Sequence, residues 1–168
     1  MILPIVAYGF DVLRKVSKDI TPDYPGLEKF IADMWETMYS SSGVGLAAPQ
    51  VNKDIRLFVV DSAQMFANMD ETETLLYSDR PGIKQVFINA QVEELHGDDW
   101  LYNEGCLSIP KIREDVYRAE EVTIRYMDEI SRATNVKYGS GEESPKKPAE
   151  EPSAPSVSRL LALVARTF

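Results

Sequence analysis

The chain has one amphipathic helix pattern near its start, and this pattern restricts the folds that it can adopt. Apolar side chains recur every three or four residues after Pro25, which predicts a helix with proline in its first turn. These side chains are Leu27, Phe30, Ile31, Met34 and Met38. The serine-rich run Ser40–Gly43 is typical of a helix end. A single helix of this kind needs another element to cover its apolar face.

Short runs of β-branched and aromatic residues follow the helix pattern and supply that element. Residues 55–61 read IRLFVVD, which predicts a buried strand. Further strands are predicted at 85–90 and 91–95, and the alternation of Val122, Ile124 and Tyr126 predicts a half-buried strand. The expected fold class is therefore α+β, with mainly antiparallel sheets packed around a helix.

The composition changes near residue 130, and the chain of 168 residues divides there. Residues 1–130 have the size and apolar content of one folded domain. Residues 131–168 are expected to form a divergent tail, with a linker rich in Pro, Ser, Glu and Lys over 139–158. Ser158–Phe168 could form a short terminal helix that either docks or frays.

Charge and cysteine content exclude several classes of function. Lys and Arg number 18 against 27 Asp and Glu, a formal net charge of −9, so no broad cationic face is available for nucleic acid or anionic lipid. One cysteine cannot form an internal disulfide, and the first residues lack the pattern of a secretory signal. No apolar stretch is long enough to cross a bilayer. We therefore expect a cytoplasmic protein that binds neither nucleic acid nor membrane.

Residues 43–50, GVGLAAPQ, form a segment with very small side chains. Glycine permits close approach, so the backbone of Gly43, Gly45 and Leu46 could pair with an extended peptide as an added strand, with Gln50 as an oriented donor. The alternative is a tight connection between helix and strand, because glycine-rich turns are common. Composition alone favours this structural interpretation.

Residues 103–110, NEGCLSIP, contain the only thiol of the chain, Cys106. A free cysteine most often behaves as a small buried hydrophobe. A metal ligand or a nucleophile is the alternative, because the thiolate form of cysteine does both.

GVGLAAPQ followed about fifty residues later by EGCLS resembles the peptide deformylases, metallohydrolases that remove the formyl group from nascent polypeptides. The resemblance covers about residues 1–130. It implies Cys106 as a ligand of the catalytic metal, Fe²⁺ or another divalent ion such as Zn²⁺ or Ni²⁺. It also implies Gln50 and the N–H of Leu107 as oxyanion donors and the backbone of Gly45 as the part of the substrate-binding strip that holds the substrate. The implied partners are formyl-methionyl nascent peptides near the ribosome.

The family's third motif, H-E-x-x-H on a helix, is not in this sequence. The 168 residues contain one histidine, His96. We interpret His96 as an exposed loop residue; a metal site combining it with Cys106 and Glu104, Asp98 or Asp99 is a weaker alternative. Val122 and Ile124 are expected to lose cover without the catalytic helix. A shifted reading frame or a divergent gene end would both explain a fold truncated at that helix.

The predicted function is therefore peptide deformylase-like, with the family's reaction impaired by the missing ligands and general base. The alternatives are a non-catalytic remnant or formyl-peptide-binding module, and a plain interaction domain in which Cys106 is packing. The sequence does not decide the oligomeric state.

Overall fold

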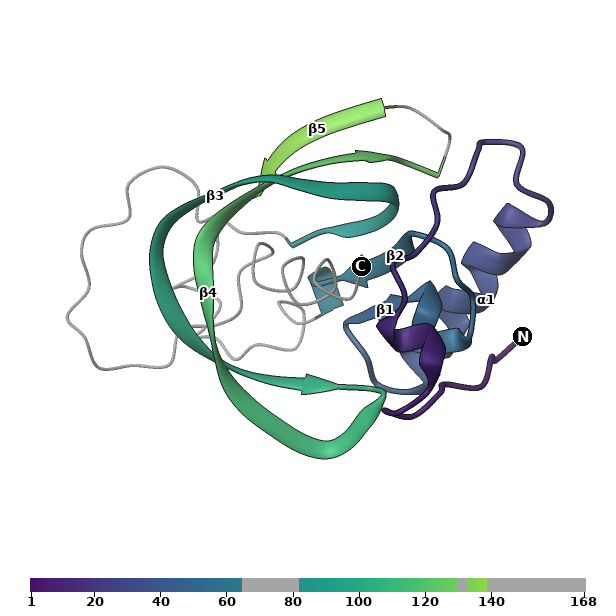
Figure 1. Cartoon of the computed structure of the whole chain (residues 1–168), viewed down its shortest axis with the longest axis horizontal. Coiled ribbons are helices and arrows are strands. Elements are labelled where there is room, and N and C mark those ends of the chain that lie inside the picture. The colour runs from purple at the N-terminus through teal and green to yellow at the C-terminus, as the bar shows by residue number, and fades with distance from the viewer. Residues whose placement is uncertain (65–81, 130–132, 139–168) are drawn as a thin grey trace.

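The computed structural model describes residues 1–64, 82–129 and 133–138 (Figure 1). Its elements in chain order are η1 (Asp11–Arg14), α1 (Leu27–Ser40), β1 (Gly45–Ala47), η2 (Ala48–Val51), β2 (Leu57–Asp61), β3 (Lys84–Cys106), β4 (Ile109–Met127) and β5 (Ala133–Tyr138). The linker and terminal helix expected beyond residue 138 lie outside the described residues. Strand β5, which the sequence did not predict, lies beyond the proposed boundary at residue 130.

The strands form one antiparallel sheet in the order β1-β2-β3-β4-β5. Figure 1 shows β3 and β4 as a long hairpin that curls away from α1 and returns toward it. The register between these two strands shifts at four places, and such irregularities bend and twist a hairpin. The predicted α+β class with antiparallel strands is confirmed.

Helix α1 begins at Leu27 and ends at Ser40, so the predicted helix is confirmed. Pro25 lies before the N-cap residue Gly26 and not in the first turn, because Gly26 has φ of 74°, a left-handed conformation outside the helix. The apolar stripe faces inward: Met34 and Met38 have no exposed surface. This stripe packs against one face of the sheet.

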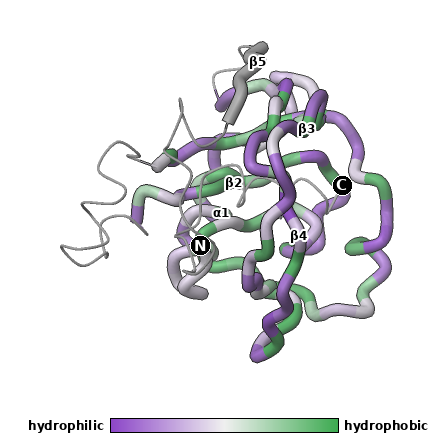
Figure 2. Tube along the Cα trace, turned by 90° about the vertical axis from the view of Figure 1, so that its left-hand side faces the viewer, coloured by the Kyte–Doolittle hydropathy of each residue, from purple (hydrophilic) through white to green (hydrophobic). Residues whose placement is uncertain are grey.

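Strand β2 has apolar cores on both of its faces. Leu57 and Val59 belong to the cluster that includes α1, whereas Phe58 and Val60 belong to a second cluster on the opposite face. In the second cluster the rings of Phe58 and Phe87 stack at 4.7 Å between centroids. Figure 2 shows the apolar character of the β2 region beside the mixed pattern of the hairpin.

Val122 and Ile124 lie in the second cluster and are 1% and 0% exposed. The expectation that they lose cover is wrong, because they pack with Phe87 and Tyr126. His96 is exposed, as predicted, but it lies within β3 and not in a loop. Its strand conformation comes from pairing with β4, opposite Glu121.

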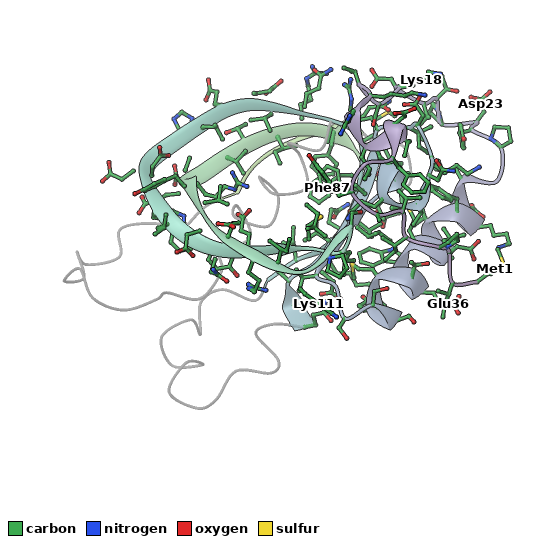
Figure 3. The ribbon with its side chains drawn as sticks, turned by 60° about the horizontal axis from the view of Figure 1, so that its bottom comes forward. Met1, Lys18, Asp23, Glu36, Phe87 and Lys111 are labelled. Carbon is green, nitrogen blue, oxygen red and sulfur yellow. The ribbon has the colours of Figure 1, made fainter. Side chains whose placement is uncertain are left out.

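The segment before α1 forms hydrogen bonds with η2, with the connection between β3 and β4, and with the start of β3. Val6 N–H donates to the Gln50 carbonyl (2.8 Å), and Tyr8 N–H donates to the Ser108 carbonyl (2.9 Å). Near the base of β3, the Asn89 side chain accepts from the N–H and donates to the carbonyl of Ile20. Figure 3 shows Met1 beside Glu36 of α1, where its amino group forms an ion pair. In the described residues, no helix has the length and apolar character needed to span a bilayer.

Candidate functional site

The tip of the β3–β4 hairpin brings the two sequence motifs together. Cys106 pairs with Ile109, so Leu107 and Ser108 form the connection between the strands. This connection lies against Gln50, in the short helical turn η2. Lys111, just after the connection, lies at the end of the hairpin nearest the body (Figure 3). Segments more than fifty residues apart in the sequence thus form one site.

Gln50 is the central polar side chain of the site and is 8% exposed. Its Oε1 accepts a hydrogen bond from the N–H of Ala47 (2.9 Å). Because an N–H must face the oxygen of the amide, the Nε2 group is directed the other way. Nε2 lies 3.7 Å from Cys106 Sγ and 3.4 Å from Ser108 Oγ. The backbone of Ala47 therefore orients Gln50 as a donor toward the thiol.

Cys106 is exposed, so its interpretation as a buried structural cysteine is wrong. The reason is its place at the end of β3, where the strand leaves the sheet and its side chain faces a pocket. Ser108, which the sequence analysis did not single out, is 4% exposed and accepts from Gln50. The sequence signal that could have identified Ser108 is its place in the EGCLS motif.

Strand β1 is an edge strand in the described sheet, with β2 as its neighbour. The Val44 carbonyl accepts from the Asp61 N–H (2.9 Å), so this group faces β2. Backbone groups alternate between the two sides of an antiparallel strand, so those of Gly45 face the open edge. Gly45 also lines the pocket. It has the geometry expected for pairing with an added strand.

Gly43 and Leu46 have different surroundings from Gly45. Gly43 is buried; its N–H donates to the Met38 carbonyl (2.9 Å), and its carbonyl accepts from Gln64 Nε2 (3.0 Å). A Cβ at Gly43 would lie 2.8 Å from Cδ1 of Leu107, so the glycine permits close approach of the hairpin tip. The Leu46 side chain has no exposed surface and belongs to the core.

A pocket of about 690 Å³ opens beside these residues. Three stretches line it: Tyr8 and Leu13, the segment 42–45 with Gln50, and the continuous stretch 102–113. Arg113 in the last stretch donates to the side-chain oxygen of Asn103 (2.6 Å) and to its carbonyl (2.7 Å).

Tyr39 of α1 donates a hydrogen bond to Asp61, whose N–H donates to the Val44 carbonyl in the first motif. Burial and the hydrogen bond to Asp61 raise the pKa of Tyr39 above its usual value.

The donor groups around Cys106 do not match a metal site with three protein ligands. In the described residues, no group of three or more His, Cys, Asp and Glu side chains is placed to hold a metal ion. His96 contacts Glu94 (2.8 Å) and lies ten residues before Cys106 on the same strand, roughly 33 Å of chain at about 3.3 Å per residue. The structure does not bring His96, Asp98 or Asp99 together with the thiol.

Comparison with known proteins identifies the family of the chain. The model of the polypeptide deformylase family matches residues 2–141. A peptide deformylase of Flavobacterium johnsoniae is 54% identical over 129 residues, which are 77% of this chain. The chain belongs to the peptide deformylase family. It spans 65% of the length of that curated relative.

Solved structures of peptide deformylases have the same fold. One from Synechococcus elongatus, in complex with actinonin, is 33% identical with a TM-score of 0.69; the match covers 83% of this chain and 68% of that one. A Met-Ala-Ser-bound class I type b peptide deformylase from Acinetobacter baumannii is 28% identical with a TM-score of 0.70, over 84% and 86% of the two chains. The predicted resemblance to the peptide deformylases is confirmed.

Proposed function

We propose that the pocket binds the formyl-methionyl ends of nascent polypeptides, and that these 168 residues hydrolyse the formyl group slowly or not at all. The observation that carries the proposal is the arrangement of Gln50 Nε2, Cys106 and the open edge of β1 around one pocket. The proposed setting is the cytoplasm, close to the ribosome, with residues 1–130 and the paired strand β5 as the binding domain and the residues beyond 138 as a tail.

In this proposal an extended peptide pairs with the edge of β1. The N–H and carbonyl of Gly45 supply the main-chain hydrogen bonds. Gln50 Nε2 and the Leu107 N–H donate to the formyl oxygen, while Gly43 and Leu46 maintain the shape of the strip. A family member with bound Met-Ala-Ser supports a peptide ligand.

Cys106 is the residue that we propose as a ligand for Fe²⁺, Zn²⁺ or Ni²⁺. Such an ion generates hydroxide near neutral pH when protein ligands hold it in an open site. Family resemblance implies two imidazoles beside the thiolate, and the sequence contains one histidine, on a distant part of β3. Impaired turnover is therefore part of the proposal.

Calorimetry with formyl-Met-Ala-Ser, combined with a formate assay and elemental analysis, tests both parts. We expect the purified chain to bind the formyl peptide and to release little formate. Gly45→Pro should abolish binding, because proline lacks the N–H that faces the open edge while the pairing with β2 remains. Gly45→Ala keeps the N–H and is the matched control, so it should bind.

The outcomes separate the alternatives. Equal binding by Gly45→Pro and the unaltered chain would rule out pairing of the peptide with the edge of β1. No binding by either would reduce the chain to a remnant without a peptide site. Rapid formate release with one transition metal ion per chain would overturn the proposed impairment and leave the peptide site in place.

A further inference from the structure

A buried ion pair crosses the β3–β4 hairpin close to the site, and none of the proposed roles uses it. Arg118 Nε and Nη2 donate to the two carboxylate oxygens of Glu104 at 2.8 and 2.7 Å. The side chains are 8% and 5% exposed. Buried charges are costly to desolvate, so a pair of this kind is weak evidence for stability by itself and invites a search for a specific role.

The pair lies diagonally across the hairpin. Glu104 is opposite Glu114 in the sheet, whereas Arg118 is opposite Trp100. The register is unbroken from Asp99 to Gly105, so Glu104 and Arg118 point to the same face of the hairpin. Neighbouring strands are rotated relative to each other, so a bond between positions four residues apart along the hairpin holds one value of that rotation.

The register breaks immediately after the ion pair. Gly105 is opposite Arg113, but the next residue, Cys106, is opposite Ile109, so three residues of β4 bulge out at this point. Lys111 in this bulge has φ of 72°. The regular ladder therefore stops one residue before the thiol. Glu104 is the last buried side chain that ties β3 to β4 before that break.

We infer that the Glu104–Arg118 pair is a positioning device, which sets the angle at which the hairpin tip holds Cys106 against Gln50. On the far side of the break, the tip is held by the Tyr8 N–H on the Ser108 carbonyl, by Gln50 Nε2 on Ser108 Oγ and by Leu107 against Gly43. On the near side, the exposed hydrogen bonds of Arg113 to Asn103 and the buried Glu104–Arg118 pair join β3 to β4. The ion pair is the buried one of these two links, and it couples the tip to the curved body of the hairpin from below. The inference rests on this geometry and does not require turnover.

Reactivity of the thiol tests the inference, because Cys106 is the only cysteine. The rate of its reaction with a disulfide reagent such as dithiobis(nitrobenzoate) is measured at one pH on fully folded protein. Glu104→Gln and Arg118→Lys should each raise the rate at least threefold by releasing the tip. Glu93→Gln, which breaks the exposed Arg125–Glu93 pair on the same hairpin, is the matched control and should leave the rate unchanged.

A pair that served stability alone would lower the melting temperature of both variants and leave the folded-state rate unchanged, and this result would overturn the inference. If neither variant shows a cooperative unfolding transition, the double replacement E104M/R118M substitutes apolar side chains of similar reach. An unchanged rate in that protein would overturn the inference equally. Peptide binding plays no part in this readout, so failure of the proposed function would be seen separately.

Discussion

At the scale of single residues, the site depends on the lack of a side chain at Gly43. The Gly43 N–H donates to the Met38 carbonyl in α1, the Gly43 carbonyl accepts from the Gln64 side chain after β2, and Leu107 from the hairpin tip lies directly over Gly43. The two residues are 64 positions apart in the sequence. Their contact sets the distance between the first motif and the thiol-bearing tip.

Replacing Gly43 with alanine should therefore destabilise the protein by about 1–3 kcal/mol, the usual cost of overpacking. The new Cβ would meet Leu107 Cδ1 at 2.8 Å and the Met38 carbonyl at 3.3 Å. Urea unfolding measures the loss. Gly105→Ala is the control, because its Cβ would come no closer than 3.1 Å to any atom, and its neighbours there belong to the Arg113 side chain and not to the backbone. Equal stability of the two variants would contradict the argument.

At the scale of elements, a break in β3 anchors the segment before α1. Asn89 has φ of 53°, in the left-handed region that asparagine tolerates better than most residues. The register with β4 shifts there, between Ile88 and Gln91. This conformation turns the side-chain amide toward Ile20, where it forms hydrogen bonds of 2.9 and 2.7 Å with the backbone. The bulge thus serves as a docking point for residues outside the sheet.

Two substitutions at Asn89 separate the backbone conformation from the hydrogen bonds. Asn89→Gly loses both bonds to Ile20 and should cost about 2 kcal/mol. Asn89→Ala loses the same bonds and adds left-handed strain of about 1 kcal/mol, so it should be the less stable variant. Thermal and urea unfolding measure both values. Alanine equal to or better than glycine would show that the conformation of this residue carries no strain.

Elements of this chain differ in how far local patterns predict them. Helix α1 and strand β2 each have a continuous signal in the local sequence. The helix has an apolar period of about 3.6 residues, and the strand is an uninterrupted run whose five residues are all buried in the structure. The middle of β3 has such a signal only over 91–95, which was predicted as strand and lies within β3. His96 was assigned to a loop because the residues around it, 93–99, are mostly charged or polar. Pairing with β4 makes the segment a strand, and that is a long-range interaction.

At the scale of the whole molecule, β2 and the base of β3 are packed on both faces. Phe87 has no exposed surface and lies within 4.7 Å of the Phe58 ring and 4.5 Å of the Tyr126 ring, between centroids. The second cluster therefore joins β2, β3 and β4 through aromatic side chains. The hairpin that carries the site is fixed to the body at this cluster.

Removal of the central ring should weaken the whole fold. Phe87→Ala is expected to cost about 3–5 kcal/mol, the range for aromatic residues in cores. Tyr117→Ala, on the exposed face of β4, should change stability by less than about 0.5 kcal/mol. Denaturant unfolding of both variants provides the comparison. A small effect of Phe87→Ala would mean that the second cluster contributes little to holding the hairpin.

The site was predictable from the sequence only in part. Resemblance supplied Gln50, Leu107, Gly45 and Cys106, because both motifs are intact. Local patterns could not supply the burial of Gly43 or the exposure of the thiol, since both depend on where the hairpin tip meets the body. The Glu104–Arg118 pair likewise forms only when β3 and β4 curl together.

The pocket walls come from three separate parts of the chain: Tyr8 with Leu13, residues 42–45 with Gln50, and residues 102–113. Such wide separation has a consequence for biosynthesis. A polypeptide emerging from the tunnel can complete α1 early, but the cavity closes only after the last of these stretches has been translated and has folded back. Nascent fragments that stop before Tyr102 therefore lack the far wall and offer a ligand only part of the pocket.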